Sequence, residues 1–259
     1  MELPEAPAPP PLCVACRGAL RPGAAFCAGC GHRVGEPAPP PRVAATSGWP
    51  DIRYALVFYF VLLGTQGAIA IAAAIGADTR TVSIFGDSLF AVAALVGAAR
   101  IRSDLPALYG RAGFGPLGYA LIALASLPMF VAVAAFVNLL QSTFHVSSEG
   151  YRDLYALGTG WAFLLLCITP PLFEELAFRG TIFGLLRRHL SLREAFVISS
   201  FAFAILHLSI PSLITHVPLG LYFCWLRCRG QSLWPGMFAH FLHNSWVLVQ
   251  DQYGVLPGL

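Results

Sequence analysis

Long apolar runs separated by short polar segments fill the chain from residue 51 onward. Seven runs can be distinguished, over residues 54–76, 82–99, 117–140, 157–184, 195–210, 211–226 and 233–249. A helix that crosses the hydrocarbon core of a bilayer needs about 20 predominantly apolar residues. The fifth to seventh runs are shorter, so we expect them to be tilted, extended at their ends or shielded by neighbouring helices. The pattern predicts an all-α, polytopic transmembrane helix bundle of about seven spans.

Arginine residues mark one side of this predicted bundle. They lie before the first run and after the second, fourth and sixth, at Arg53, Arg100, Arg102, Arg111, Arg187, Arg188, Arg193, Arg227 and Arg229. The intervening loops hold only Arg80 and Arg152. Because loops that stay in the cytoplasm carry the excess of positive charge, we expect a cytoplasmic N-terminus and, with seven spans, a C-terminus on the opposite side.

The composition agrees with a membrane protein. The chain is 57% apolar and 11% charged, against a soluble average of roughly 25% charged residues. A formal charge of +3 is too small to suggest a nucleic-acid partner. All 16 Lys and Arg residues are arginines, which excludes a lysine Schiff base, a Ser/Lys dyad and a lysine-bearing phosphate loop. The lysine-free, alanine- and proline-rich composition favours a bacterial source, so we expect a multi-pass protein of the bacterial cytoplasmic membrane.

The first fifty residues form a separate module. They hold two Cys-x-x-Cys pairs whose four thiolates suit tetrahedral zinc, at Cys13, Cys16, Cys27 and Cys30. So short a stretch cannot bury enough apolar area to fold alone, and metal ligation would supply the missing free energy. Two disulfides or inert thiols are the alternative, but a reducing cytoplasm favours zinc. Residues 11–33 resemble the zinc-ribbon family. We therefore predict a zinc ribbon over 1–33 with one structural zinc, a proline-rich linker over 34–52 and a transmembrane domain over 53–259.

Polar groups at membrane depth are concentrated in the second half of the chain. Each ionisable side chain there costs about 2.5 to 3.5 kcal/mol on insertion, so each calls for a partner or a function. The fourth to seventh runs contain Glu174, Glu175, Arg179, His207, His216, His240, His243 and Asn244. A lone intramembrane histidine is more often a helix-to-helix hydrogen-bonding residue, and we assign His216 and His243 to that class. We read Asp87, in the second run, as structural too.

Helical spacing separates the remaining groups into roles. Glu175 and Arg179 are four residues apart on one face and can form an ion pair, whereas Glu174 is rotated by about 100° and keeps a free carboxylate. His240 and Asn244 are also four residues apart. At about 1.5 Å of rise per residue, Glu174, the two histidines His207 and His240, and Asn244 lie roughly 11 to 18 Å from the cytoplasmic ends of their helices. We expect them to converge on one cavity that opens toward the cytoplasm.

A carboxylate, two histidines and an amide around a hydrated cavity form a hydrolytic set. Glu174 could act as general base on a water molecule that His207 orients. His240 and Asn244 could donate hydrogen bonds to the oxyanion that forms when a peptide carbonyl is attacked. A zinc ion held by Glu174 and the two histidines is an alternative that we do not favour. The sequence lacks a G-x-S-x-G elbow, an H-E-x-x-H pair and a G-x-G-D motif.

These residues also resemble a known family. The motifs E-E-x-x-x-R, F-x-x-x-H and H-x-x-x-N occur in this order as Glu174-Glu175-Leu-Ala-Phe-Arg179, Phe203-Ala-Ile-Leu-His207 and His240-Phe-Leu-His243-Asn244. They are similar to those of the CAAX-protease and bacteriocin-processing (CPBP, or Abi) family of intramembrane endopeptidases, over roughly residues 155 to 250. The resemblance implies peptide-bond hydrolysis inside a membrane cavity. The family is commonly called a metalloprotease family. The resemblance also implies a mechanism without a catalytic metal, in which a glutamate activates the water molecule, and we favour this mechanism.

Two other functions are compatible with such a bundle. The first is a non-catalytic membrane scaffold or bacteriocin-immunity protein that works by binding. The second is a small transporter, which is disfavoured because no inverted repeat or pair of broken helices is evident. For an endopeptidase, the expected partners are a membrane-associated peptide or protein substrate and the lipid bilayer. The substrate and the oligomeric state remain open.

Overall fold

The computed structural model describes residues 11–14, 20, 23, 25–26, 32–35, 48–110, 114–144 and 158–255. The chain divides into two compact units, Met1–Gly48 and Trp49–Leu259. Within the described residues every regular element is a helix, and the only extended pairing is an isolated antiparallel bridge between Phe26 and Arg33.

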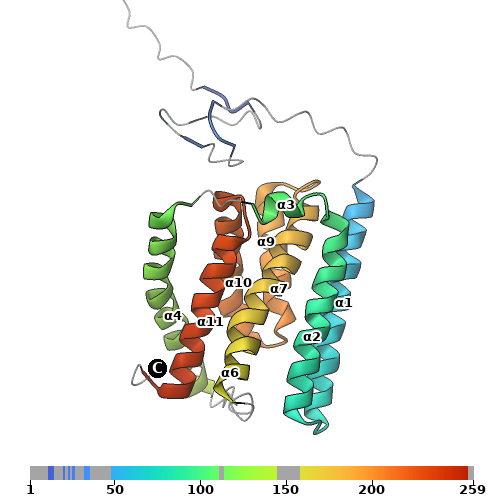
Figure 1. Cartoon of the computed structure of the whole chain (residues 1–259), viewed down its shortest axis with the longest axis vertical. Helices are drawn as coiled ribbons and strands as arrows, with labels where there is room; N and C mark the ends of the chain where they lie inside the picture. Colours follow the sequence, from blue (N-terminus) through green and yellow to red (C-terminus); the bar gives the residue numbers. More distant parts are fainter. Residues whose placement is uncertain are drawn as a thin grey trace, which may run out of the picture. The chain divides into compact units, whose positions relative to one another are not determined.

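In the described part of the second unit there are seven long helices, whose arrangement is drawn in Figure 1. They are α1 (Trp49–Ala74), α2 (Thr79–Ala98), α4 (Pro116–Phe144), a continuous fourth helix, α9 (Leu192–Leu206), α10 (Ile210–Gly230) and α11 (Trp234–Tyr253). The fourth helix consists of α6 (Thr159–Ala162), the π-helical segment η2 (Phe163–Ile168), α7 (Thr169–Glu175), the π-helical segment η3 (Leu176–Ile182) and α8 (Phe183–Leu186). Two short helices, η1 (Ala99–Ile101) and α3 (Leu105–Leu108), follow α2.

Four of these helices are long and apolar enough to cross a membrane, over Trp49–Ala74, Arg80–Ile101, Pro116–Thr143 and Thr159–Leu186. They support an integral membrane protein. Helices α10 and α11 have 21 and 20 residues but carry more polar groups. Helix α9 has only 15 residues, a length of about 22 Å at 1.5 Å per residue.

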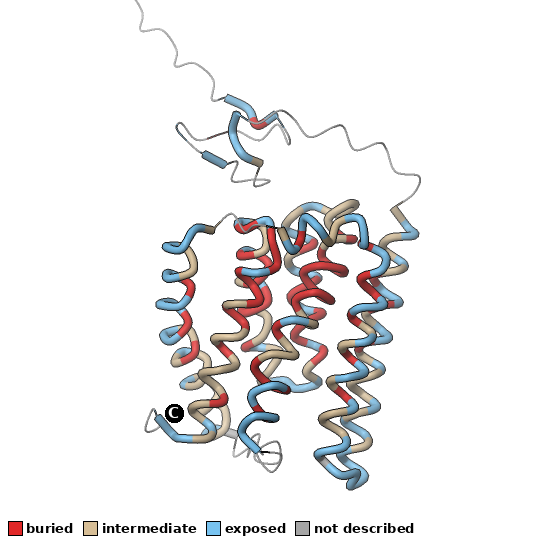
Figure 2. Tube along the Cα trace, viewed as in Figure 1, coloured by how far each residue is buried: buried red, intermediate tan, exposed pale blue. Residues whose placement is uncertain are grey.

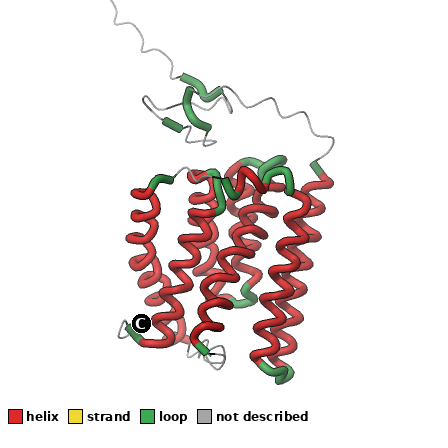
Figure 3. Tube along the Cα trace, viewed as in Figure 1, coloured by secondary structure: helices red, strands yellow, loops and turns green. Residues whose placement is uncertain are grey.

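Helix α9 ends earlier than the apolar pattern predicts. The fifth run extends to residue 210, whereas the helix stops at Leu206, and Leu208 has a positive φ of 51°. The reason lies in the next helix, because the Ser209 side chain accepts a hydrogen bond from the Ser212 backbone and Pro211 occupies its first turn. The turn between α9 and α10 therefore lies well short of the lower ends of α1 and α2 (Figure 3).

The opposite end of α9 is set by a capping box. The Ser191 hydroxyl accepts from the Glu194 backbone N–H, and the Glu194 carboxylate accepts from the Ser191 backbone N–H at 2.8 Å. These hydrogen bonds from Ser191 hold the pKa of the Glu194 carboxyl below its usual value. The helix is thus fixed at both ends by local sequence signals.

The fourth helix lies at the centre of the packing. Half of its most apolar window is buried, compared with 17%, 28% and 17% for the windows of α1, α2 and α4. Figure 2 shows buried residues concentrated on the upper parts of the fourth helix, α9, α10 and α11. The core there includes Phe178, Phe203 and Phe223. On the fourth helix, Glu175, Arg179 and Thr181 are therefore enclosed by protein.

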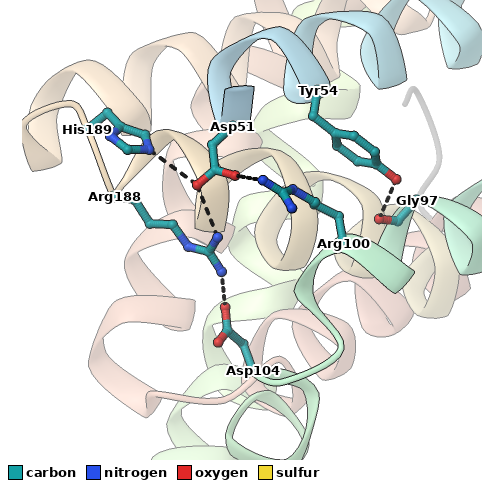
Figure 4. Close-up of polar contacts among 7 residues, drawn as sticks. All are labelled: Asp51, Tyr54, Gly97, Arg100, Asp104, Arg188 and His189. Carbon is teal, nitrogen blue, oxygen red and sulfur yellow. Dashed lines mark hydrogen bonds and ion pairs between the residues drawn. The ribbon is translucent and has the colours of Figure 1, made fainter. Parts of the chain in front are cut away.

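A polar cluster closes the arginine-rich end of the bundle (Figure 4). The Asp51 carboxylate accepts from Arg100 at 2.6 Å and from Arg188 at 3.1 Å, and lies 3.2 Å from His189. Arg188 also pairs with Asp104 at 2.7 Å. The cluster joins the start of α1, the segment after α2 and the turn after α8.

Candidate active site

A helix that passes through two consecutive prolines positions the candidate base. The carbonyl of Leu166 would normally accept from the N–H of residue 170 in an α-helix or residue 171 in a π-helix, but both are proline and have no N–H. Instead, the Asn244 side-chain amide donates to this carbonyl at 2.9 Å. The fourth helix therefore continues through Pro170 and Pro171 to Leu186, which carries Glu174 and its neighbours into the core.

The residue after Glu174 in the sequence, Glu175, belongs to a buried ion pair. Glu175 and Arg179 are both fully buried, with Glu175 Oε1 3.0 Å from an Arg179 guanidinium nitrogen. The guanidinium also donates to the Gly220 carbonyl of α10 at 3.3 Å and lies over the rings of Phe203 and Phe223, at 4.3 and 5.1 Å from their centroids. This is the pairing that the four-residue spacing predicts, and it links the fourth helix to α9 and α10.

His240 bridges the two glutamates. Its Nδ1 lies 3.3 Å from Glu175 Oε1, and its Nε2 lies 3.9 Å from Glu174 Oε2. Because the Glu175 carboxylate is paired with Arg179, it can only accept, so Nδ1 of His240 carries a proton. When the ring is neutral, Nε2 therefore holds the lone pair. Glu175 thus sets the tautomer of His240. The gap to Glu174 is longer than a hydrogen bond and leaves the two groups able to exchange a proton through water.

His207 and His216 form a second histidine pair. Their ring centroids are 3.9 Å apart. His207 Nδ1 lies 3.0 Å from the Phe203 carbonyl, and His216 Nδ1 lies 3.0 Å from the Ser212 carbonyl. Since a carbonyl can only accept, both Nδ1 atoms are donors, and both neutral rings keep an Nε2 lone pair. His216, which the sequence placed among structural histidines, therefore lies against His207, because the short turn after α9 brings the start of α10 back toward it.

Glu174 and His207 line the same cavity. It has a volume of about 280 Å³, and its walls are Gln66, Ile69, Ala70, Glu174, Leu206, His207 and Leu208. An apolar cavity of about 510 Å³ is lined farther along α1 and α9 by residues that include Tyr59, Phe201 and Ile205. Residues of α1, the fourth helix and α9 line both cavities, and Glu174 lines the smaller one.

The other predicted residues are placed differently. Asn244 and His240 are not among the cavity-lining residues, and the Asn244 amide donates to the Leu166 backbone. His243 is buried with its ring 6.3 Å from that of Phe130. Sequence reasoning missed Gln66, a cavity residue, because it considered ionisable groups at membrane depth. An amide inside the apolar run of α1 was the available signal.

The described residues do not supply a zinc site in the bundle. No group of three or more His, Cys, Asp or Glu side chains among them is arranged to hold a metal ion. The set of Glu174, His207 and His240 considered from the sequence is not such a group. Of the four predicted ribbon ligands, Cys13 is described, while Cys16, Cys27 and Cys30 lie outside the described residues.

Comparison with known proteins points to one family. Residues 156–246 match the family model described as type II CAAX prenyl endopeptidase Rce1-like. This segment contains Glu174, Glu175, Arg179, His207, His240 and Asn244. It is thus similar to a membrane protease domain, on the helices that form the site.

Two curated bacterial relatives match over part of their length. The chain is 34% identical over 84 residues to the protein named "Putative membrane peptidase YdiL" of Bacillus subtilis, and 32% identical over 84 residues to the protein YaiH of Lactococcus lactis. Each match covers 32% of this chain and 34% of the relative. The chain therefore spans about a third of the length of these relatives. No solved structure matches the chain significantly.

Proposed function

We propose that the protein is an intramembrane endopeptidase that hydrolyses a peptide bond of a membrane-associated protein or peptide. The observation that carries this proposal is the carboxylate of Glu174, which lines a cavity with His207 and lies 3.9 Å from His240. The similarity of residues 156–246 to a CAAX endopeptidase family supports it. Neither a serine nor a cysteine nucleophile is needed.

Glu174 acts as the general base. It takes a proton from a water molecule whose other hydrogen is accepted by His207 Nε2, and the resulting hydroxide attacks the peptide carbonyl carbon. The C–N bond then breaks, and the proton held by Glu174 passes to the departing amine, directly or through His240. Glu175 and Arg179 hold His240 in the tautomer that this transfer needs. The reaction consumes one water molecule and releases a carboxylic acid and an amine.

The membrane arrangement is part of the proposal. Helices α10 and α11, each about 30 Å long at 1.5 Å per residue, and the shorter α9 would complete seven spans. The arginine-rich end would face the cytoplasm of a bacterial cell, with the N-terminal unit on that side. A substrate in the bilayer would reach Glu174 along α1 and α9, where the second cavity is lined by apolar side chains.

The N-terminal unit is proposed to be a zinc ribbon. Described residues on either side of each Cys-x-x-Cys pair contact one another: Leu20 donates to the Pro11 carbonyl at 2.8 Å, and Val34 donates to the Ala25 carbonyl at 3.0 Å. Cys13 is buried beside Leu20. These hydrogen bonds join residues that flank the two Cys-x-x-Cys pairs in the sequence, and four thiolates are the ligand set of a tetrahedral structural zinc site.

The test uses substitutions of Glu174. Glu174→Ala is expected to abolish cleavage and leave the melting temperature in detergent unchanged, while Glu194→Gln, an exposed carboxylate on α9, keeps full activity as the matched control. Substrates are found by comparing native membranes that contain the wild type with membranes that contain Glu174→Gln, in which uncleaved proteins accumulate. Equal turnover by Glu174→Ala would refute the proposal, and a cellular phenotype retained by that variant would favour a scaffold or immunity protein.

A further inference from the structure

His207 lies where helix α9 ends, so the helix backbone alone does not fix its ring. It is the C-cap residue of the helix, and Leu208, which follows it, has a positive φ of 51°. The proposed reaction needs the Nε2 atom of His207 at a fixed place, because the ring orients the water molecule that Glu174 activates, and both residues line one cavity. The contacts that hold this ring therefore affect catalysis.

Two residues contact the His207 ring closely. Its Nδ1 donates to the Phe203 carbonyl at 3.0 Å, and the Phe203 ring stands nearly perpendicular to it, with centroids 5.1 Å apart. The His216 ring of α10 is closer, with centroids 3.9 Å apart and planes inclined by 39°. A single hydrogen bond leaves an imidazole able to swing about that contact, and the two neighbouring rings restrict this swing.

The His216 ring is itself held by its own helix. Its Nδ1 lies 3.0 Å from the Ser212 carbonyl, one turn earlier in α10, and 3.0 Å from the Thr215 hydroxyl. The same turn is fixed at its start, because the Ser209 side chain caps the helix and Pro211 occupies its first turn. Since these hydrogen bonds lie within α10, His216 presents to His207 a ring whose orientation is already set.

We propose that His216 is a positioning residue, whose ring packs against His207 and keeps the Nε2 atom of His207 directed at the water molecule beside Glu174. This inference rests on the proposed endopeptidase function. His216 lies outside the three sequence motifs, and it acts through His207, since it is not among the residues that line the cavity. A displacement of about 1 Å at a reacting group can lower the rate by about 10²-fold, so the effect of this contact is measurable.

The experiment separates the ring of His216 from its nitrogen atoms. His216→Ala removes the ring, whereas His216→Phe keeps a flat ring at the same position. Ile214→Ala, at an exposed residue of the same turn, is the matched control for lost side-chain volume. Turnover is measured in proteoliposomes with a mixture of quenched fluorescent peptides that contain an apolar segment. The ring nitrogens are observed by NMR of protein with isotope-labelled histidine, and His207→Gln assigns the His207 signals.

His216→Ala is expected to lower kcat by about 10²-fold with KM little changed, while His216→Phe stays within about threefold of the wild type. Ile214→Ala should behave as the wild type. The signal of the protonated Nδ1 of His207 should broaden or split in His216→Ala and stay single in His216→Phe. Melting temperatures establish that each variant is folded at the assay temperature.

Wild-type kcat in His216→Ala would overturn the inference, as would a single, sharp His207 signal in that variant. An equal loss of kcat in His216→Phe would also overturn it, because the effect would then belong to the nitrogen atoms of His216. Glu174→Ala is assayed beside them. If it cleaves normally, the endopeptidase function fails, whereas inactive Glu174→Ala with fully active His216→Ala refutes the role of His216 alone.

Discussion

The carboxylate of Glu175 accepts from two buried groups, Arg179 and His240. Replacing Glu175 by alanine leaves the Arg179 guanidinium buried without a counter-charge. Replacing Arg179 by alanine likewise leaves the Glu175 carboxylate buried without a counter-charge. Removing one partner of a buried pair typically costs about 3 to 5 kcal/mol. We therefore expect Glu175→Ala and Arg179→Ala each to lower the melting temperature in detergent. An unchanged melting temperature in both variants would contradict this.

A double substitution separates the stability of this site from its chemistry. In Glu175→Leu/Arg179→Met neither charge remains, and well-packed apolar replacements of a buried ion pair are often neutral or stabilising. The double variant should be more stable than either single alanine variant. It should still be inactive, because His240 has then lost the acceptor that sets its tautomer.

At the scale of the helix, the two prolines of the fourth helix leave the Leu166 carbonyl without a backbone donor, and Asn244 of α11 supplies one. Asn244→Leu removes the donor from the Leu166 carbonyl and leaves a buried acceptor unsatisfied, which costs about 1 to 3 kcal/mol. Adding Pro170→Ala to this variant returns a backbone N–H four residues after Leu166, and part of the lost stability should return. Thermal unfolding of the wild type, the two single variants and the double variant measures the coupling. Independent, additive effects would show that Asn244 does not serve this carbonyl.

The helices were more predictable than their contacts. Within the described residues each of the seven apolar runs coincides with a long helix, and four of these helices are long and apolar enough to cross a membrane. The end of α9 was wrong by four residues, since Ser209 and Pro211 start the next helix before the apolar run stops. The Glu175–Arg179 pair followed from spacing within one helix. The approach of His216 to His207 and the position of Gln66 did not, because both depend on how different helices meet.

At the scale of the whole chain, the polar residues are divided between the centre and one end. The fourth helix is half buried and carries the ionisable site, whereas α1, α2 and α4 expose most of their apolar surface. At the arginine-rich end, ion pairs between Asp51 and the side chains of Arg100 and Arg188 join the helices to one another (Figure 4). The bundle therefore has its own core and its own closing contacts, all within Trp49–Leu259.

The N-terminal unit, Met1–Gly48, is the subject of a prediction for metal content. A four-cysteine ribbon owes its folding to the metal, since apo modules of this size lack a sufficient core. We expect one zinc per chain in the purified protein, lost in Cys27→Ser and retained in Cys228→Ser, a cysteine of α10. Elemental analysis of the three proteins measures this. A count near zero in the wild type would refute the ribbon, and one zinc retained by Cys27→Ser would place the metal elsewhere. Among the residues that the structure describes, the core of the bundle includes none from the N-terminal unit. We therefore expect Cys27→Ser to leave the thermal unfolding of the bundle and its peptidase activity unchanged.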